Sequence, residues 1–194
     1  DLGIVGDDAA QLADTLRSAA ADADAIVSSG GVSVGDYDLV KQVLAGLGGV
    51  QFWRVALQPG KPFAFGALGD TPFFGLPGNP VSVTVTFEQL VRPALLCCMG
   101  ARALFRPRVP GVLREAASTD PERTVFLRVH AAYRDGRWEA ASSGAQGSHV
   151  LSALARADAF AVVPAGVGDL APGAEVELEM FRWPETRSKE EALG

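Results

Sequence analysis

Residues 25–38 read AIVSSGGVSVGDYD, the pattern of a strand, a loop and the start of a helix. Its first three residues are apolar, as is typical of a short buried strand. They run into a glycine-containing loop, 28–35, and Asp36 then provides a helix start signal. The glycines allow the backbone to approach a ligand closely. Because strand and helix alternate here and on both sides, the sequence predicts an α/β domain with a mostly parallel sheet.

The residues before this stretch predict a helix. Asp8 is placed as its N-cap, and Gln11 stands at the reciprocal position of a capping box. The apolar residues of this helix share one face: Leu12, Leu16 and Ala19. Segment 2–5 reads LGIV, the pattern of the end of a buried strand. Because a domain rarely begins there, we expect the sequence to be a fragment of a longer protein.

The residues after this stretch predict a second helix and three strands. The helix has its apolar stripe at Val40, Val43, Leu44 and Leu47, and two glycines end it. Segment 51–57 alternates apolar and polar residues, as a strand does. The sequence PGKP at 59–62 is a rigid turn. Segments 63–68 and 73–74 are predicted to form a strand pair around Gly69 and Asp70.

Residues 81–87 carry conflicting signals. Their sequence VSVTVTF alternates with a period of two, which favours a strand. However, Asn79 is a good N-cap residue, Pro80 suits the first helical turn, and Gly100 is a plausible stop. Because the start and stop signals agree, we predict a helix here.

After residue 100 the sequence pattern changes from alternating strands and helices to short strands. We assign 1–100 to the α/β domain, in which the first strand and helix are missing, and 101–107 to a linker. Residues 108–183 contain several short strands, including a hairpin around Asp135 and Gly136, and predict a small antiparallel β-barrel. Residues 184–194 form a charged tail. The fold class is therefore a three-layer α/β domain followed by a barrel.

Composition excludes several functional classes. The hydrophobic fraction of 48% with a net charge of −6 excludes a disordered chain. An acidic chain lacks the electrostatic footprint of a nucleic-acid-binding protein. No uninterrupted apolar run approaches the ~20 residues of a membrane helix. The only cysteines, Cys97 and Cys98, are adjacent, so we read them as reduced thiols of a cytoplasmic protein.

Two carboxylates are candidates for metal binding. Asp7 follows a predicted strand end, and Asp38 follows the glycine loop. The carboxyl ends of neighbouring strands in an open α/β sheet face one crevice, so the two side chains could converge there. Paired carboxylates are hard oxygen ligands of the kind Mg²⁺ prefers. The alternative is that these residues and their neighbours cap helices or interact with helix dipoles.

Several polar residues are candidates for anion binding, each with a structural alternative. The loop at 28–35 precedes a helix N-terminus, an intrinsic anion site, but it also reads as a tight turn. Lys61 lies between two prolines, and a stiff turn reduces the entropy lost on gripping an anion; an ordinary surface lysine is the alternative. Arg54, Arg128 and Ser148 are unremarkable from local sequence. His149 has no partner at ligand spacing and reads as structural.

Three motifs together resemble one family. They are SSGGVSVGDYD at 28–38, PGKP at 59–62 and LPGNP at 76–80, and QGSH at 146–149 also matches. They resemble, in order and spacing, the molybdopterin molybdenumtransferases, or molybdenum insertases, that include bacterial MoeA and the E domain of gephyrin. The resemblance covers nearly the whole chain and corresponds to the later part of family members, which have further N-terminal domains and dimerise.

The resemblance implies roles for residues at matching positions. Asp7 and Asp38 match carboxylates tied to Mg²⁺ and to cleavage of a phosphoanhydride. Six polar residues match positions that the family associates with molybdate or with the phosphate end of the cofactor: Ser33, Arg54, Lys61, Ser82, Arg128 and Ser148. Pro77 and Pro80 match positions that shape the pocket. Gln58 stands where many members have lysine, and Arg54 where lysine is common; the loss of one cation at Gln58 should weaken anion binding.

The resemblance also implies a reaction and partners. Family members insert molybdate into adenylated molybdopterin, using Mg²⁺ and releasing AMP. We therefore expect these two substrates, a homodimer in the full-length form, and the molybdopterin adenylyltransferase as a further partner. We expect the isolated chain to have little or no activity of its own.

Three other readings are consistent with parts of the sequence. One is a related α/β domain that adenylates molybdopterin, but that family has a Gly-Gly-Thr-Gly type of loop and no barrel. Another is a non-catalytic scaffold, since gephyrin also clusters receptors. The third is a small-molecule binding module related to competence-damage proteins, against which the LPGNP motif and the barrel argue.

Overall fold

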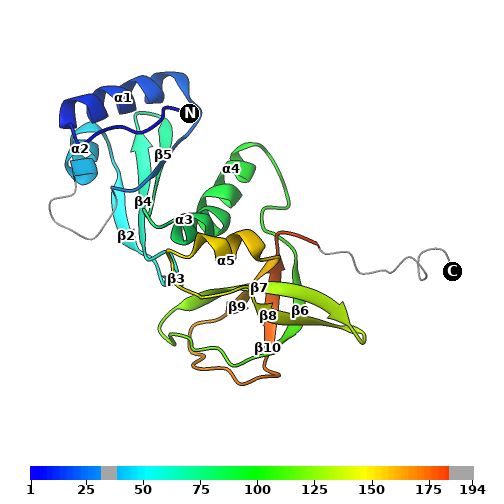
Figure 1. The fold of residues 1–194 in the computed structure, drawn as a ribbon. Helices are drawn as coiled ribbons and strands as arrows, with labels where there is room; N and C mark the ends of the chain where they lie inside the picture. Colours follow the sequence, from blue (N-terminus) through cyan, green and yellow to red (C-terminus); the bar gives the residue numbers. More distant parts are fainter. Residues whose placement is uncertain (32–38, 184–194) are drawn as a thin grey trace. The chain divides into compact units, whose positions relative to one another are not determined.

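Figure 1 shows the computed structural model of the chain, which describes residues 1–31 and 39–183. The chain folds into two compact units. The first comprises Asp1–Val55 and Gly60–Gly100, and the second comprises Ala56–Pro59 and the chain from Ala101 onward. The short segment Ala56–Pro59 thus leaves the first unit and joins the second, an exchange that no local pattern predicted.

The first unit contains a four-stranded sheet. Its order is β1 (Ile26–Ser29), β5 (Thr71–Leu76), β4 (Pro62–Leu68) and β2 (Gln51–Arg54). The β1–β5 pair is parallel, whereas the β5–β4 and β4–β2 pairs are antiparallel. The expectation of a mostly parallel sheet is therefore wrong for these strands. The predicted turn at 69–70 joins β4 directly to β5, and so short a connection requires antiparallel strands.

Helices cover both faces of this sheet, so the predicted three-layer arrangement is confirmed. On one face, α1 (Ala9–Asp22) and α2 (Leu39–Leu47) share a core with the sheet. On the other face lie α3 (Pro80–Thr86), the π-helical turn η1 (Phe87–Val91) and α4 (Arg92–Cys98). Adjacent residues of β5 separate the two cores: Phe73 packs with α1 and α2, and Phe74 packs with the second helical layer.

The helix predicted after Asn79 is confirmed. Helical structure runs without a break from Pro80 to Cys98, and the Asn79 carbonyl accepts a hydrogen bond from the Val83 N–H at 2.9 Å. Val81, Val85 and Val91 are fully buried. Contrary to expectation, this stretch is long and apolar enough, by length and composition, to cross a membrane. A helix that packs in the core of a domain passes the same test, and one side of this helix packs on the sheet.

Residues 2–5 do not form the expected end of a buried strand. They lie outside any strand, and Leu2 and Ile4 are exposed. An apolar segment becomes a buried strand only where a neighbouring strand accepts its hydrogen bonds, and among the described residues no strand pairs with this segment.

The second unit is a closed barrel of five strands. They are β6 (Arg108–Leu113), β7 (Thr124–Arg134), β8 (Arg137–Ser142), β9 (Ala159–Val163) and β10 (Glu175–Met180). The order is β7-β8-β6-β10-β9, and pairing of β9 with β7 closes the barrel. Closure leaves no exposed sheet edge within the ring. The short strand β3 (Leu57–Gln58) adds to β7 in parallel, and α5 (Leu151–Arg156) lies between β8 and β9 in the chain.

The barrel is not purely antiparallel, because β6 and β8 pair in parallel. The remaining pairs of the ring are antiparallel. The predicted hairpin is confirmed: Asp135 and Gly136 have φ values of 49° and 81° and connect β7 to β8. Two successive positive φ values are the geometry of a type I′ turn, whose twist matches that of the flanking strands.

The pair Asp7 and Asp8 separates into two local roles. The Asp8 carboxylate accepts a hydrogen bond from the Gln11 N–H at 2.8 Å and caps α1, as predicted. Asp7 is exposed and lies outside the helix. We therefore expect Asp8→Ala to lower the free energy of unfolding by about 1 kcal/mol, the usual value of a side-chain N-cap.

Urea denaturation followed by circular dichroism would measure this loss. Asp7→Ala is the matched control, because it removes the same charge one residue outside the cap. Equal losses for the two variants would contradict the assignment of the cap to Asp8.

Candidate oxyanion site

The first group of site residues lies at the carboxyl ends of the two parallel strands. Ser29 of β1 is in register with Leu76 of β5. Directly after them, the Gly30 N–H donates to the carbonyls of Leu76 and Pro77 at 3.0 and 3.3 Å. The glycine loop and the LPGNP motif are therefore joined by backbone hydrogen bonds. In open α/β folds, this end of the sheet is where ligands bind.

Glycine is required at the start of the first loop. Gly30 and Gly31 have φ values of 86° and 68°, in the left-handed region that side chains disfavour. Pro77, Pro80 and Ser82 follow on the other side of the junction, with Ser82 buried in the first turn of α3. Two predicted site residues of the first loop, Ser33 and Asp38, lie outside the described residues.

Two basic residues lie near one another at the end of β2. Arg54 is in register with Pro62 of β4, the residue that follows Lys61. The Val55 N–H donates to the Lys61 carbonyl at 2.8 Å, which fixes the backbone there. Both Arg54 and Lys61 are exposed. The register thus places two basic residues at adjacent strand ends, where positive charge attracts anions.

The turn that carries Lys61 is held against α3. Gly60 has a φ of 121°, and a Cβ atom placed on it would lie 2.6 Å from the Thr86 hydroxyl oxygen. Thr86 itself is fully buried, and its hydroxyl makes no hydrogen bond with other described residues. Neither residue was singled out as a site residue from sequence. A glycine within a PGKP turn was the available signal, but the tight contact is a tertiary property.

The second unit buries a cation. Arg128 of β7 is 1% exposed, and its Nη2 atom donates to the carbonyls of Ala145 and Gly147, both at 3.1 Å. Its Nε atom is buried and has no hydrogen-bond partner in the described part of the chain. Burial lowers the pKa of the Arg128 guanidinium below its ordinary value. Ser148 directly follows Gly147, so the structure places two predicted residues on one loop and the strand beside it.

No carboxylate of the described residues forms an ion pair with Arg128, and burial is the sole cause of its pKa shift. A buried charge is costly unless it is paired and hydrogen-bonded. The two carbonyls satisfy part of the guanidinium but carry no net charge. The Arg128 guanidinium thus has neither a counter-charge nor an acceptor for Nε among the described residues.

Among the described residues, only single carboxylates, and no cluster of ligands, are available to bind a metal ion. Within residues 1–31 and 39–183, no group of three or more His, Cys, Asp or Glu side chains could hold a metal ion. Mg²⁺ does not need such a group, because it is often bound by one or two carboxylates with water and substrate phosphates completing the shell. Asp7, an exposed carboxylate, fits that donor chemistry.

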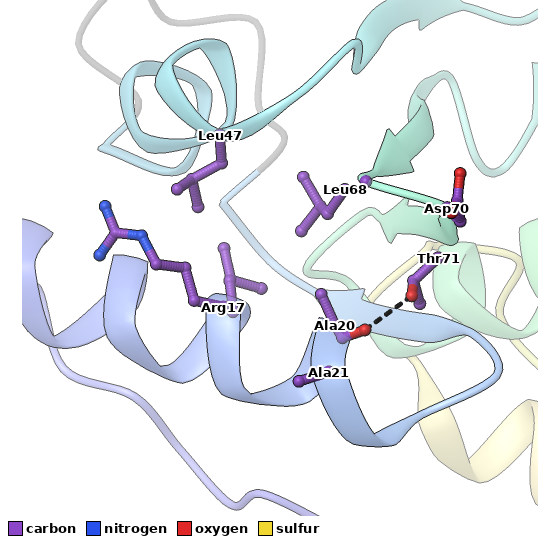
Figure 2. Close-up of a pocket in the computed structure, with 9 residues that line it drawn as sticks. Arg17, Ala20, Ala21, Leu47, Leu68, Asp70 and Thr71 are labelled. Carbon is purple, nitrogen blue, oxygen red and sulfur yellow. Dashed lines mark hydrogen bonds between the residues drawn. The ribbon is translucent and has the colours of Figure 1, made fainter.

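A separate pocket of about 390 Å³ lies between α1, α2 and the β4–β5 turn (Figure 2). Its wall is tied together by the Thr71 hydroxyl, which donates to the Ala20 carbonyl at 2.8 Å. Thr71 begins β5, so this pocket lies at the opposite end of that strand from Leu76. None of the residues predicted to bind substrate lines it. We therefore place the candidate site at the motif loops and not in this pocket.

Comparison with known families also divides the chain into two parts, which correspond to the two units of the structure. Residues 1–96 match the model of a probable molybdopterin-binding domain, and residues 110–181 match that of the MoeA C-terminal region, domain IV. The class is therefore a molybdopterin-binding α/β domain followed by a MoeA-type barrel.

Individual relatives support the same assignment. The chain is 39% identical, over 93% of its length, to the molybdopterin molybdenumtransferase of Haemophilus influenzae, and 34% identical, over 91%, to gephyrin of Dictyostelium discoideum. A crystal structure of the molybdopterin biosynthesis MoeA protein from a Pyrococcus species matches 94% of the chain with a TM-score of 0.76 and 32% identity. The chain belongs to the molybdopterin molybdenumtransferase family of MoeA and gephyrin.

The chain covers less than half of the length of each of these relatives. The chain spans 45% of the Haemophilus protein, 28% of the Dictyostelium protein and 43% of the Pyrococcus chain. The activity of a whole family member is therefore a matter for proposal here.

The close contact at Gly60 gives a test of how the Lys61 turn is held. We expect Gly60→Ala to destabilise the first unit, because the new Cβ meets the Thr86 hydroxyl and the φ of 121° is unfavourable for alanine. Gly69→Ala is a control for a positive φ without a steric contact: its φ is 62°, and no atom lies within 4 Å of the added Cβ. Thermal unfolding should show a loss of about 1–2 kcal/mol for Gly69→Ala, from the backbone alone, and a larger loss for Gly60→Ala.

The double variant Gly60→Ala with Thr86→Ala separates the two causes. Relief of the steric contact should make the loss caused by Gly60→Ala smaller in the Thr86→Ala background than in the unsubstituted chain, and the loss that remains is the backbone cost of the φ of 121°. If Gly60→Ala were no worse than Gly69→Ala, the packing of the turn on α3 would not be what holds it.

Proposed function

We propose that this chain is the part of a molybdopterin molybdenumtransferase that binds molybdate and the phosphate end of adenylated molybdopterin. The full reaction would be Mg²⁺-dependent insertion of molybdate with release of AMP, in a cytoplasmic protein. The observation that carries the proposal is the buried Arg128 guanidinium, which has an unpartnered Nε and no counter-charge among the described residues.

An oxyanion is the ligand that best completes the Arg128 site. Guanidinium groups bind oxyanions through several N–H donors in a fixed plane, and burial strengthens such contacts. The Nη2 atom is already engaged by two backbone carbonyls, so the side chain is held in place before any ligand arrives. Pre-positioning lowers the entropy that binding would cost. Ser148, on the adjoining loop, is a hydroxyl donor of the kind that would complete the contact.

The first unit, taken by itself, offers cations for a phosphate. Lys61 and Arg54 stand at neighbouring strand ends, and the loop of Pro77, Pro80 and Ser82 joins the glycine loop at Gly30. In an acidic chain of net charge −6, an anionic substrate needs such local concentrations of positive charge. The lysine common at the position of Gln58 in the family is missing, so we expect weaker molybdate binding than in lysine-containing members.

The carboxylates Asp7 and Asp38 would hold Mg²⁺ together with the substrate phosphates. When bound, Mg²⁺ would supply Lewis-acid activation and charge screening at the phosphoanhydride. No protein nucleophile is required, since water or a molybdate oxygen can attack phosphorus while AMP departs. Cys97 and Cys98 are both exposed on α4 and receive no sulfur-transfer role.

Molybdate binding by Arg128 is the direct test. Isothermal titration of molybdate into the chain should give saturable binding, and Arg128→Met should weaken it about tenfold or more. A hydrogen bond to a charged group is worth about 1.5–3 kcal/mol, and 1.4 kcal/mol corresponds to a factor of ten in affinity. Arg137→Met, at an exposed arginine of the same unit, is the control and should bind molybdate normally.

A folded chain that does not bind molybdate would contradict the proposal and would favour a non-catalytic scaffold or a binding module of the same fold. Equal weakening by Arg137→Met would show that general electrostatics, and not the buried arginine, attracts the anion.

The carboxylates have a separate test in an enzyme of full family length that contains this chain. Asp7→Asn or Asp38→Asn should block Mg²⁺-dependent AMP release, followed by chromatography, while binding of the pterin is largely kept. The amide keeps the size of the side chain and removes the charge on which Mg²⁺ depends. Undiminished AMP release would remove the substituted residue from the mechanism.

A further inference from the structure

We infer that Gln146 is a positioning residue for the buried arginine. Its side-chain amide holds the Arg128 guanidinium in the orientation that binds an oxyanion. The inference rests on the proposed function for the identity of the anion. It goes further in naming a residue whose side chain would not touch the substrate but would act through Arg128.

The amide of Gln146 is bonded to both backbone groups of Arg128. Its Oε1 atom accepts a hydrogen bond from the Arg128 N–H at 2.8 Å, and its Nε2 atom donates to the Arg128 carbonyl at 3.0 Å. A residue of a neighbouring antiparallel strand makes this pair of bonds in an ordinary ladder. Here the side chain of a loop residue takes that place.

The position of Arg128 in the sheet explains why a substitute is needed. Strand β8 pairs with β7 only as far as Ser142, which faces Val129. The next residue, Ser143, still donates its N–H to the Arg128 carbonyl at 3.1 Å, and the chain then turns away. The N–H of Arg128 would lose its ladder partner at this point, and Gln146 supplies one. The backbone of Arg128 is thereby fixed where the regular sheet ends.

The same amide also fixes the loop. Its Nε2 atom lies 3.1 Å from the Ser142 hydroxyl and 2.9 Å from the Gly144 carbonyl. The Ser142 hydroxyl in turn donates to the Gly144 carbonyl at 2.8 Å. Gly144 has a φ of 138°, so the turn takes a path that other residues would disfavour. Gln146 therefore links strand β7, the end of β8 and the loop between β8 and α5.

The consequence for the guanidinium follows from the order of residues in the loop. The two carbonyls that accept from Arg128 Nη2 belong to Ala145 and Gly147, the residues on either side of Gln146. One side chain thus fixes both the backbone of Arg128 and the two acceptors that hold its guanidinium. With Nη2 held in this way, Nε remains a buried donor without a hydrogen-bond partner among the described residues.

The test compares Gln146→Met with Ser143→Ala. Methionine keeps the approximate size of glutamine and removes its hydrogen bonds. Ser143→Ala removes a buried hydrogen bond from the Ser143 hydroxyl to the Ala153 carbonyl, 2.7 Å long, and so weakens the same region without touching the Gln146 amide. Two readouts are taken in the whole chain: the Arg128 Nε–H resonance by ¹⁵N NMR, and the dissociation constant for molybdate by calorimetry.

We expect Gln146→Met to shift the Arg128 Nε–H resonance, speed its exchange with water and weaken molybdate binding about tenfold. Ser143→Ala should lower the thermal midpoint and leave both readouts near those of the unsubstituted chain. The inference is overturned if Gln146→Met leaves the resonance unmoved, or if Ser143→Ala weakens binding as much as Gln146→Met does.

The design separates failure of this inference from failure of the proposed function. If the unsubstituted chain does not bind molybdate, the proposed function fails, and the NMR readout still decides whether Gln146 positions Arg128. If the unsubstituted chain binds molybdate and Gln146→Met binds it equally well, the proposed function stands and the inference about Gln146 is wrong.

Discussion

The burial of the Arg128 guanidinium is the constraint on which the second unit depends. A charged group inside a small barrel is unfavourable unless it is paired and hydrogen-bonded, and the surrounding backbone satisfies only part of this guanidinium. Two loop carbonyls accept hydrogen bonds from Nη2, and the Gln146 side-chain amide fixes the backbone of Arg128 in strand β7. The irregular segment between β8 and α5 is shaped around this cation. A barrel built for stability alone would place an apolar residue there.

The first unit has a different constraint: the polar loops that follow β1 and β5 must lie at the same end of the sheet. Only one strand pair is parallel, and that pair is where two loops leave from the same end. The bifurcated hydrogen bond from Gly30 to the carbonyls of Leu76 and Pro77 holds these loops together. The antiparallel hairpin of β4 and β5 is what returns the chain to this end. The departure from a parallel sheet therefore serves the same arrangement that a parallel sheet would have provided.

Local signals in the sequence predicted most elements, and tertiary partners explain the misses. The Asp8 cap, the Asp135 hairpin and the helix after Asn79 follow from residue types within a few positions of each other. Segment 2–5 is not a strand, because a strand needs a partner, and β3 has no local signal, because its two residues pair with a distant strand. At the site, the motif residues were identifiable, but the role of Gln146 was not, since an exposed loop glutamine carries no signal of its contacts with Arg128.

Arg128 is the candidate for anion binding on two independent grounds, the family resemblance and its own burial. The resemblance assigns an anion to the position of Arg128 without giving a physical cause. The structure supplies a cause that does not depend on the resemblance: a buried positive charge with a donor to spare and no negative partner among the described residues. In an acidic chain, general attraction of anions is weak, so discrimination has to come from such local sites. An oxyanion held there would exchange water for fixed donors, a difference that favours a small, highly charged ligand over a large, diffuse one.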